Sequence, residues 1–359
     1  MAGKSKKKSS SKTKAILIVL GVVVIVLAVL AVANVGKRVT VVEDTRIYIP
    51  TGASYNDLCD TMAAHDIIEH KALFGLLAKA RGLDKHVKPG SYVIKKGMGY
   101  LQLVQKLYTG NQNPIRITIG KYRTLRQLCD GVATKMEFTS DTLYKILNDK
   151  EFCQVYNHTP QTIIGAFTQN TYEVYWNTSP KRFVERMMME SDAFWNDERT
   201  AQLKKMGLSR KEAVTLASIV EEETNKQAEK ADIASVYLNR LKKGMRLEAD
   251  PTVKYAVGDF TLRRILERHL QTVSPYNTYL NGGLPPGPIC LPSAESIDAV
   301  LANKKTNYIY FCAKEDFSGS HNFASSYQQH LANAARYHRA LNERKILISD
   351  KFLVFSFKF

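Results

Sequence analysis

The feature that most limits how this chain can fold is an uncharged run near its start, residues 15–35. As a helix rising about 1.5 Å per residue, this run would cross a hydrocarbon core of ~30 Å. Six lysines and no acid precede it in residues 1–14, and only Lys37 and Arg38 follow closely. The positive-inside rule then places the N-terminus in the cytoplasm. The sequence therefore predicts a basic cytoplasmic tail (1–14), a single-pass anchor (15–35) in the inner (plasma) membrane, and a periplasmic or extracytoplasmic bulk.

A cleaved signal peptide is the alternative for this run, with Ala31-Val-Ala33 as its cleavage site. The apolar region of signal peptides is usually ~7–15 residues long, so the greater length here favours an uncleaved anchor. Under either interpretation, residues 36–359 are exported.

Charge and cysteine usage narrow the class of partner. Lys and Arg number 51 against 34 Asp and Glu, a net charge of +17 that suits a membrane surface, a cell-wall polymer or a nucleic acid. No recognition helix, RNA-binding aromatic motif or zinc-finger spacing is present, so nucleic acid is the least favoured of these three partners. The 5 cysteines form no Cys-x-x-Cys pair, and His321 and His330 fit no common two-ligand spacing, so we expect neither a metal nor another cofactor.

Residues 36–111 are predicted to form a compact module. A strand at 46–49, a helix opened by Ser54, a helix at 72–81 and a strand at 91–94 follow one another in a βααβ order. This order resembles the LysM fold, a sugar-binding module of cell-wall proteins. A further helix at 100–108 closes at Gly110, and residues 111–114 form a linker.

The remainder, residues 112–345, is predicted to be a mixed α/β domain, which makes the whole chain α+β. Its predicted elements are strands at 115–119 and 307–313 and helices at 125–135, 142–147, 181–191, 226–243 and 327–341. Two segments, 248–252 and 274–288, are predicted from their Pro, Gly, Asn and Tyr content to be loops, where substrate sites concentrate. Residues 346–359 form an apolar tail.

Three consecutive glutamates are the strongest candidates for chemistry. Ser209 and Glu212 form a capping box that starts a helix, and the apolar run 216–220 leads directly into Glu221, Glu222 and Glu223. Successive helical residues lie about 100° apart, so the three side chains cannot share one face. Glu221 shares the apolar stripe, and we expect it to be held inward with a raised pKa, as a general acid requires, while Glu222 is solvated. The alternative is a solvated acidic patch at a helix end, where the macrodipole disfavours negative charge.

Seven sequence blocks in one order resemble the MltG (YceG-like) family of endolytic murein transglycosylases. The blocks are Ala217-Ser-Ile-Val-Glu-x-Glu-Thr224, Ala234-Ser-Val-Tyr-Leu-Asn-Arg-Leu241, Gly244-Met-x-Leu247 with Asp250-Pro-Thr-Val253, Pro275-Tyr-Asn-Thr-Tyr279, Gly283-Leu-Pro-Pro-Gly-Pro-Ile289, Tyr310-Phe-Cys-Ala313 and His321-Asn-Phe323. A membrane anchor followed by a LysM-like module is also the layout of this family.

The resemblance implies cleavage within peptidoglycan glycan strands that leaves 1,6-anhydro-N-acetylmuramic acid ends, with Glu221 as the catalytic acid/base. Protonated Glu221 would donate to the glycosidic oxygen and then accept a proton from the sugar's own C6 hydroxyl as that hydroxyl attacks C1. An intramolecular nucleophile needs no second carboxylate to hold a water. The implied partners are the glycan strands, the membrane and the cell-wall synthesis machinery.

A second tier of residues is assigned to substrate binding. Glu223 would substitute for Glu221, orient a loop, or hydrogen-bond Asn239 or Arg240. A saccharide cleft commonly pairs polar groups for hydroxyls with aromatic faces for sugar C–H surfaces. Six further residues of these types, in the loops and near the last strand, are assigned to substrate binding: Glu248, Asp250, Tyr276, Asn277, Tyr279 and His321. The alternative is that their hydrogen bonds only fix loops or support the fold.

The chain departs from the family pattern at two places. Glu248-Ala249 stands where the family commonly has Gln before Thr-Asp-Pro, and Ile164-Gly-Ala-Phe-Thr-Gln-Asn-Thr-Tyr172 only partly matches an upstream block. The added carboxylate opens a first alternative function, a hydrolytic muramidase in which Glu248 or Asp250 activates water. A second alternative is a non-catalytic, anchored scaffold that binds the wall through its LysM-like module.

Overall fold

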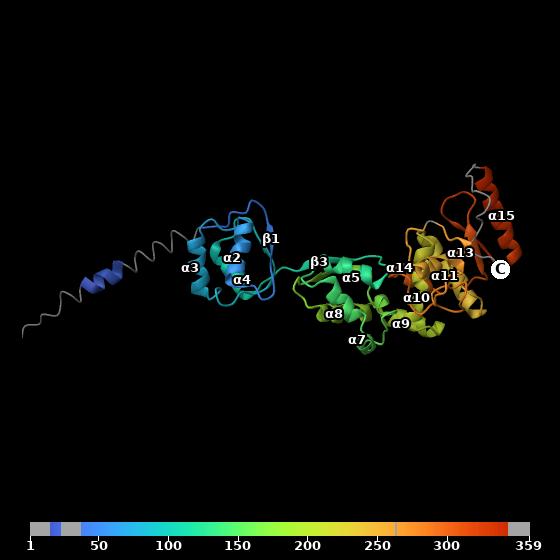
Figure 1. The fold of residues 1–359 in the computed structure, drawn as a ribbon, viewed down its shortest axis with the longest axis horizontal. Helices are drawn as coiled ribbons and strands as arrows, with labels where there is room; N and C mark the ends of the chain where they lie inside the picture. Colours follow the sequence, from blue (N-terminus) through green and yellow to red (C-terminus); the bar gives the residue numbers. More distant parts are fainter. Residues whose placement is uncertain (1–14, 23–36, 263, 344–359) are drawn as a thin grey trace, which may run out of the picture. The chain divides into compact units, whose positions relative to one another are not determined.

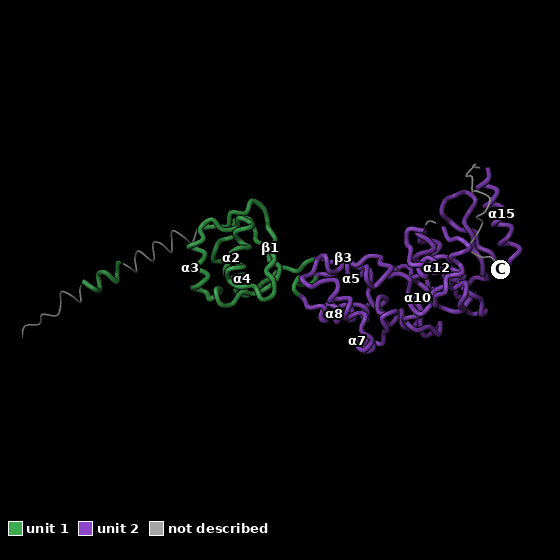
Figure 2. Tube along the Cα trace, in the orientation of Figure 1, with its two compact units in different colours: residues 1–115, 174–177 green, residues 116–173, 178–359 purple. Residues whose placement is uncertain are grey.

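The computed structural model describes residues 15–22, 37–262 and 264–343 (Figure 1). By its internal contacts the chain divides into two compact units (Figure 2). Unit 1 comprises residues 1–115 and 174–177, and unit 2 comprises residues 116–173 and 178–359. The short segment 174–177 therefore belongs with a unit that otherwise ends before it in the sequence.

Unit 1 contains the predicted βααβ order. Its elements are β1 (Thr45–Ile49), α2 (Tyr55–Ala64), α3 (Lys71–Arg81), β2 (Gly90–Ile94) and α4 (Tyr100–Thr109). The strands pair antiparallel, with Thr45 opposite Ile94. Alternate side chains of a strand face one side of a sheet, and Ile47 and Ile49 accordingly lie in a core with Leu58. The helices start and end where local signals place them: Ser54 caps α2, and Gly110 in the left-handed conformation ends α4.

A small sheet and a group of helices come next in the chain, and all their residues except Ile115 and Val174 belong to unit 2. In chain order these are β3 (Ile115–Ile119), α5 (Leu125–Ala133), α6 (Ser140–Leu147), α7 (Lys150–Val155), η1 (Ile163–Ala166), β4 (Asn170–Val174), α8 (Pro180–Phe194) and α9 (Asp197–Met206). β3 and β4 pair in a two-stranded sheet. The loop between β3 and α5 is important for the site described below.

The second part of unit 2 is built around helix α10. Its elements are α10 (Arg210–Glu223), α11 (Gln227–Lys242), α12 (Asp250–Val257), α13 (Glu267–Leu270), α14 (Ala294–Leu301), β5 (Tyr310–Ala313), β6 (His321–Ala324) and α15 (Tyr327–Glu343). The run Ala213 to Val220 is buried on every face of α10, because α11, α12, α14 and η1 pack around it. A helix that is buried all round lies at the centre of a core.

Two predicted elements differ from those in the structure, and a third prediction concerns residues that the structure describes only in part. Residues 248–252 were expected to form a loop, but Asp250 begins α12 with Pro251 in the first turn, where its missing N–H costs no hydrogen bond. The strand expected at 307–313 is limited to Tyr310–Ala313. Of the predicted anchor, residues 15–22 are helical and the rest, with both predicted tails, lies outside the described residues. Within the described ranges, no helix has the length and apolar character needed to span a membrane.

Candidate active site

Helix α10 carries the three glutamates to its C-terminal end. The predicted capping box is present: the Ser209 hydroxyl accepts from the Glu212 N–H, and the Glu212 carboxylate accepts from the Ser209 N–H at 2.8 Å. The helix ends at Glu223, so its last turn holds all three carboxyls. Carboxylates are unfavourable at this end of a helix dipole, and each of the three therefore depends on its own partners.

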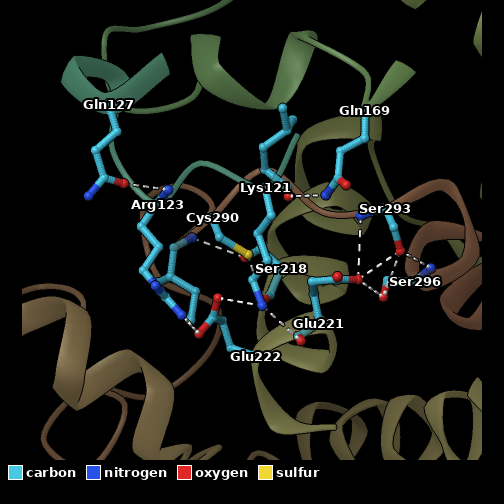
Figure 3. A network of polar contacts seen from close by, with 12 residues as sticks. Lys121, Arg123, Gln127, Gln169, Ser218, Glu221, Glu222, Cys290, Ser293 and Ser296 are labelled. Atoms are coloured by element: carbon cyan, nitrogen blue, oxygen red, sulfur yellow. Dashed lines mark hydrogen bonds and ion pairs between the residues drawn. The ribbon is translucent and has the colours of Figure 1, made fainter. Parts of the chain in front are cut away.

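Glu221 is fixed by a ring of donors (Figure 3). Its Oε2 atom accepts hydrogen bonds from Lys230 Nζ at 2.9 Å and Ser293 Oγ at 2.7 Å, and from the Ser296 hydroxyl. The side chains of Glu221 and Lys230 are 13% and 8% exposed. The prediction that Glu221 is held inward is confirmed.

The expected direction of the Glu221 pKa shift is wrong. Burial raises the pKa, but hydrogen bonds from Ser296, Lys230 and Ser293 and the positive charge of Lys230 together outweigh burial and lower it. Helical periodicity predicts that Glu221 is on the buried face of α10, and therefore predicts the effect of burial. It does not predict the hydrogen-bond donors, which come from α11 and the start of α14. Glu221 is consequently a carboxylate at neutral pH.

Glu222 is not solvated, in contrast to the prediction. Its side chain is 10% exposed and forms salt bridges with Lys121 at 2.8 Å and Arg123 at 3.0 Å. Figure 3 shows Lys121 and Arg123 beside Glu222. Both cations belong to the loop between β3 and α5, which is held against this region because Tyr122 O accepts from Leu291 N at 2.7 Å. The loop thus brings two positive charges to the end of α10.

Glu223 has a different environment from its two neighbours. Its Oε1 atom accepts a hydrogen bond of 2.5 Å from the Tyr237 hydroxyl, and not from Asn239 or Arg240 as expected. Burial and the negative charges of Asp250 and Glu222 raise the pKa of Glu223 to about 8, although the bond from Tyr237 opposes the shift. Glu223 therefore largely keeps its proton at neutral pH.

The two polar residues predicted on α11 are committed to the fold. Asn239 Nδ2 donates to the carbonyl oxygens of Thr306 and Tyr308, both at 2.9 Å. Arg240 is 1% exposed and forms a salt bridge of 3.0 Å with Glu248. Glu248 is thus held by a buried guanidinium, which disfavours its use as a base that activates water.

The remaining second-tier residues also have partners of their own. Asp250 Oδ1 accepts from the Tyr279 hydroxyl at 2.7 Å, and Asn277 Nδ2 donates to Leu270 O and Thr272 O. Tyr276 packs on Tyr255 with ring centroids 4.7 Å apart, and His321 Nδ1 lies 2.9 Å from Glu229 Oε2. The Asn277 amide is committed to two loop carbonyls and the His321 ring to Glu229, so the structure favours the loop-fixing alternative for Asn277 and a structural role for His321.

Sequence reasoning missed the residues that surround the glutamates. These are Lys121, Arg123, Lys230, Tyr237, Ser293 and Ser296. One signal was available: Ser293 is the N-cap of α14, and its hydroxyl also donates to Glu221. No group of three His, Cys, Asp or Glu side chains suited to a metal ion occurs in the part of the chain that the structure describes.

Comparison with known proteins places the chain in a family. A model of the YceG-like family matches residues 47–336. The chain belongs to the YceG-like family. An endolytic murein transglycosylase from Bacillus subtilis (strain 168) is 31% identical over 314 residues, which cover 83% of this chain and 86% of that protein.

Two further relatives support this membership. A protein of the same name from Streptococcus pneumoniae serotype 2 (strain D39 / NCTC 7466) is 26% identical over 335 residues, 85% of this chain, and the match spans 59% of that longer protein. The crystal structure of a YceG-like protein from Listeria monocytogenes is 28% identical, with a TM-score of 0.55 over 81% of this chain and 98% of that one. The mixed α/β fold is thus that of a YceG-like protein.

Proposed function

We propose that this protein is an endolytic murein transglycosylase. It cleaves the bond between N-acetylmuramic acid and N-acetylglucosamine within peptidoglycan glycan strands and leaves 1,6-anhydro-N-acetylmuramic acid ends. The observation that carries this proposal is the 31% identity to a Bacillus subtilis endolytic murein transglycosylase over 86% of its length. The position of Glu221 supports it, since a carboxylate fixed by four hydrogen-bond donors at the end of a buried helix is pre-organised for proton transfer.

The proposed reaction depends on Glu221. As the C1–O bond to the leaving sugar breaks, the leaving oxygen gains a proton, the C6 hydroxyl oxygen bonds to C1, and the hydroxyl proton passes to a base, so the reaction as a whole neither takes up nor releases a proton. Glu221, ionised at neutral pH, is suited to accept that proton. The attacking hydroxyl belongs to the sugar itself, so its effective concentration exceeds that of water and no carboxylate is needed to hold a nucleophile.

The decisive experiment is digestion of purified peptidoglycan with the exported part of the chain, residues 36–359, followed by mass spectrometry of the new ends. We expect anhydro ends, one water lighter than reducing ends. Glu221→Gln should lower the rate by at least ~10²-fold, as loss of a general acid or base usually does. Reducing ends as the main product would identify a hydrolase, and wall binding without cleavage would identify a scaffold.

We also propose that residues 15–35 anchor the protein in the inner (plasma) membrane with its N-terminus in the cytoplasm. The support is the uncharged sequence and its preceding lysines. In this arrangement unit 1, with its βααβ order, serves as a LysM-like wall-binding module and the enzyme works beside the cell-wall synthesis machinery. Membrane fractions washed with carbonate should retain the full-length protein. A mature N-terminus at Asn34 would instead show a cleaved signal peptide.

A further inference from the structure

A surplus of positive charge borders Glu221. The two loop cations, Lys121 and Arg123, both form salt bridges with the Glu222 carboxylate, at 2.8 and 3.0 Å. Lys230 forms a salt bridge with Glu221 at 2.9 Å. These contacts join three cations to two carboxylates, so the cluster carries a net positive charge. Glu222 thus receives twice the positive charge that it can neutralise.

The surplus lies on the outer side of this cluster. The side chains of the loop cations are 31% and 34% exposed, whereas those of Glu222 and Lys230 are 10% and 8% exposed. Lys121 Nζ also donates to the backbone oxygen of Glu221 at 3.4 Å (Figure 3). Glu223, the next carboxyl of the helix, largely keeps its proton and adds little negative charge. Positive charge that solvent can reach therefore lies at the edge of the proposed catalytic residue.

The loop between β3 and α5 holds its two cations in place. Tyr122 O accepts a hydrogen bond from Leu291 N at 2.7 Å, and the Tyr122 ring lies so close to α5 that a Cβ at Gly131 would collide with it. The backbone N–H of Arg123 donates to Gln127 Oε1 at 3.0 Å. Groups that are fixed before a ligand arrives lose less conformational freedom when they bind it.

The loop cations have more donors than their contacts with α10 require. A lysine ammonium has three N–H donors and an arginine guanidinium has five. Lys121 directs its donors to Glu222 Oε1 and to the Glu221 carbonyl oxygen. Arg123 directs Nε and Nη2 to Glu222 Oε2. These contacts do not use the third donor of Lys121 or the two donors on Arg123 Nη1, which suit a further acceptor.

The chemistry of these donors selects a carboxylate. Lysine and arginine form strong hydrogen bonds with oxyanions, and a positive patch at the edge of a site attracts anionic substrates. In the proposed substrate the two sugars are uncharged, because both amino groups are acetylated and the lactyl carboxyl of N-acetylmuramic acid is bonded to the stem peptide. The stem peptide ends in a carboxylate. It therefore supplies the anionic group nearest to the bond that is cleaved.

We propose that Lys121 and Arg123 bind a carboxylate of the stem peptide on the N-acetylmuramic acid at the cleavage site, an inference that rests on the proposed function. The two residues determine specificity, because they favour strands whose stem peptides carry free carboxylates. Glu222 is a positioning residue, since it holds both cations from the buried side. The substrate carboxylate binds on the outer side and neutralises the remaining positive charge.

The test compares two substrates with the full-length protein. One is a glycan strand whose stem peptides have free carboxylates, and the other is the same strand after its peptide carboxylates have been converted to amides. The two strands have almost the same size and differ in charge. Wild-type kcat/KM should be about tenfold higher on the strand with free carboxylates, as expected for a hydrogen bond between charged groups. This preference should decrease as salt is added, because ions screen partly exposed charges.

Variants of the loop show whether its cations cause the preference. Lys121→Gln and Arg123→Gln should each reduce it, chiefly through a higher KM on the strand with free carboxylates. A loss of activity caused by a disturbed site affects both strands equally and cancels in their ratio. Lys121→Arg keeps the charge and should keep the preference. The matched control is Lys135→Gln, a substitution of an exposed lysine shortly after α5, which should behave as wild type.

Either of two results would overturn this inference. One is an equal kcat/KM of the wild-type protein on the two strands, and the other is an unchanged preference in both Gln variants. Anhydro ends left by the wild-type protein would still support the proposed function in those cases. A lack of anhydro ends on both strands would instead overturn the proposed function, and this inference with it, so the two failures are distinguishable.

Discussion

The salt bridge between Glu221 and Lys230 links catalysis to stability at the level of single residues. Both side chains are largely buried, at 13% and 8% exposure. Breaking one partner of a buried pair costs about 3–5 kcal/mol because the other charge is left uncompensated. Glu221→Gln should therefore destabilise the protein, by an amount near the low end of that range since the Gln carbonyl still accepts a hydrogen bond. The sequence pattern alone, which shows a carboxyl on an apolar stripe, predicts almost no cost.

Urea unfolding of a double-mutant cycle measures this coupling. Lys230→Gln should also destabilise, and the double variant Glu221→Gln/Lys230→Gln should lose less than the sum of the single losses, because no unpaired charge remains. Additive losses would show that the pair contributes nothing beyond its separate members. The cycle also tells how much of any loss of activity in Glu221→Gln is due to unfolding.

The raised pKa of Glu223 predicts a pH dependence of stability. The folded value is about 8 and the ordinary value is 4.5, so the folded state binds this proton more tightly. The stability contribution is fully present below pH 4.5 and is lost as the pH rises through about 8. Glu223→Gln does not titrate, so its melting temperature should rise relative to wild type between pH 5 and 9. A constant difference over this range would contradict the shift.

At the scale of elements, Glu222 joins the loop between β3 and α5 to the end of α10. Its carboxylate is 10% exposed, whereas Lys121 and Arg123 are 31% and 34% exposed. Glu222→Gln should lower the free energy of unfolding by about 1–3 kcal/mol, the usual penalty when a buried polar group loses its partner. Activity should fall as well, because Lys121 Nζ also contacts Glu221 O at 3.4 Å. Thermal unfolding measures the first effect, with Glu267→Gln, a substitution of an exposed glutamate on α13, as the control. A neutral result for Glu222→Gln would show that the loop is held by other contacts.

Elements that depend on local signals could be predicted from the sequence, whereas the partners of the site could not. The capping box at Ser209 and the apolar run fix α10, and alternation fixes β1. Helix α12 was missed because its first turn, with Asp250 and Pro251, has the composition of a loop. Ser293 and Lys121 lie 72 and 100 residues from Glu221, and no local pattern reports a contact at that separation.

At the scale of the whole molecule, we expect the two units to have separate roles, with wall binding in unit 1 and catalysis in unit 2. Unit 1 has a core of its own that includes Ile47, Leu58 and Tyr92, while the three glutamates and all their partners belong to unit 2. A unit with its own core can fold without the other. A catalytic site that lies within one unit can therefore remain active when the other unit is removed. Loss of unit 1 should then weaken substrate binding more than it slows the chemical step.

A fragment that starts at residue 112 tests this division. It should cleave glycan strands at high enzyme concentration, with kcat within about tenfold of the full chain and a raised KM, because contacts made equally to substrate and transition state affect KM alone. Trp176 loses a neighbour in this fragment, because its ring lies 5.0 Å from the ring of Tyr48, which the fragment lacks. Trp176→Gln should therefore improve the solubility of the fragment without changing kcat. The complementary fragment, residues 36–110, should bind the wall and release no products. Cleavage by that fragment would place the chemistry in unit 1 and refute the division.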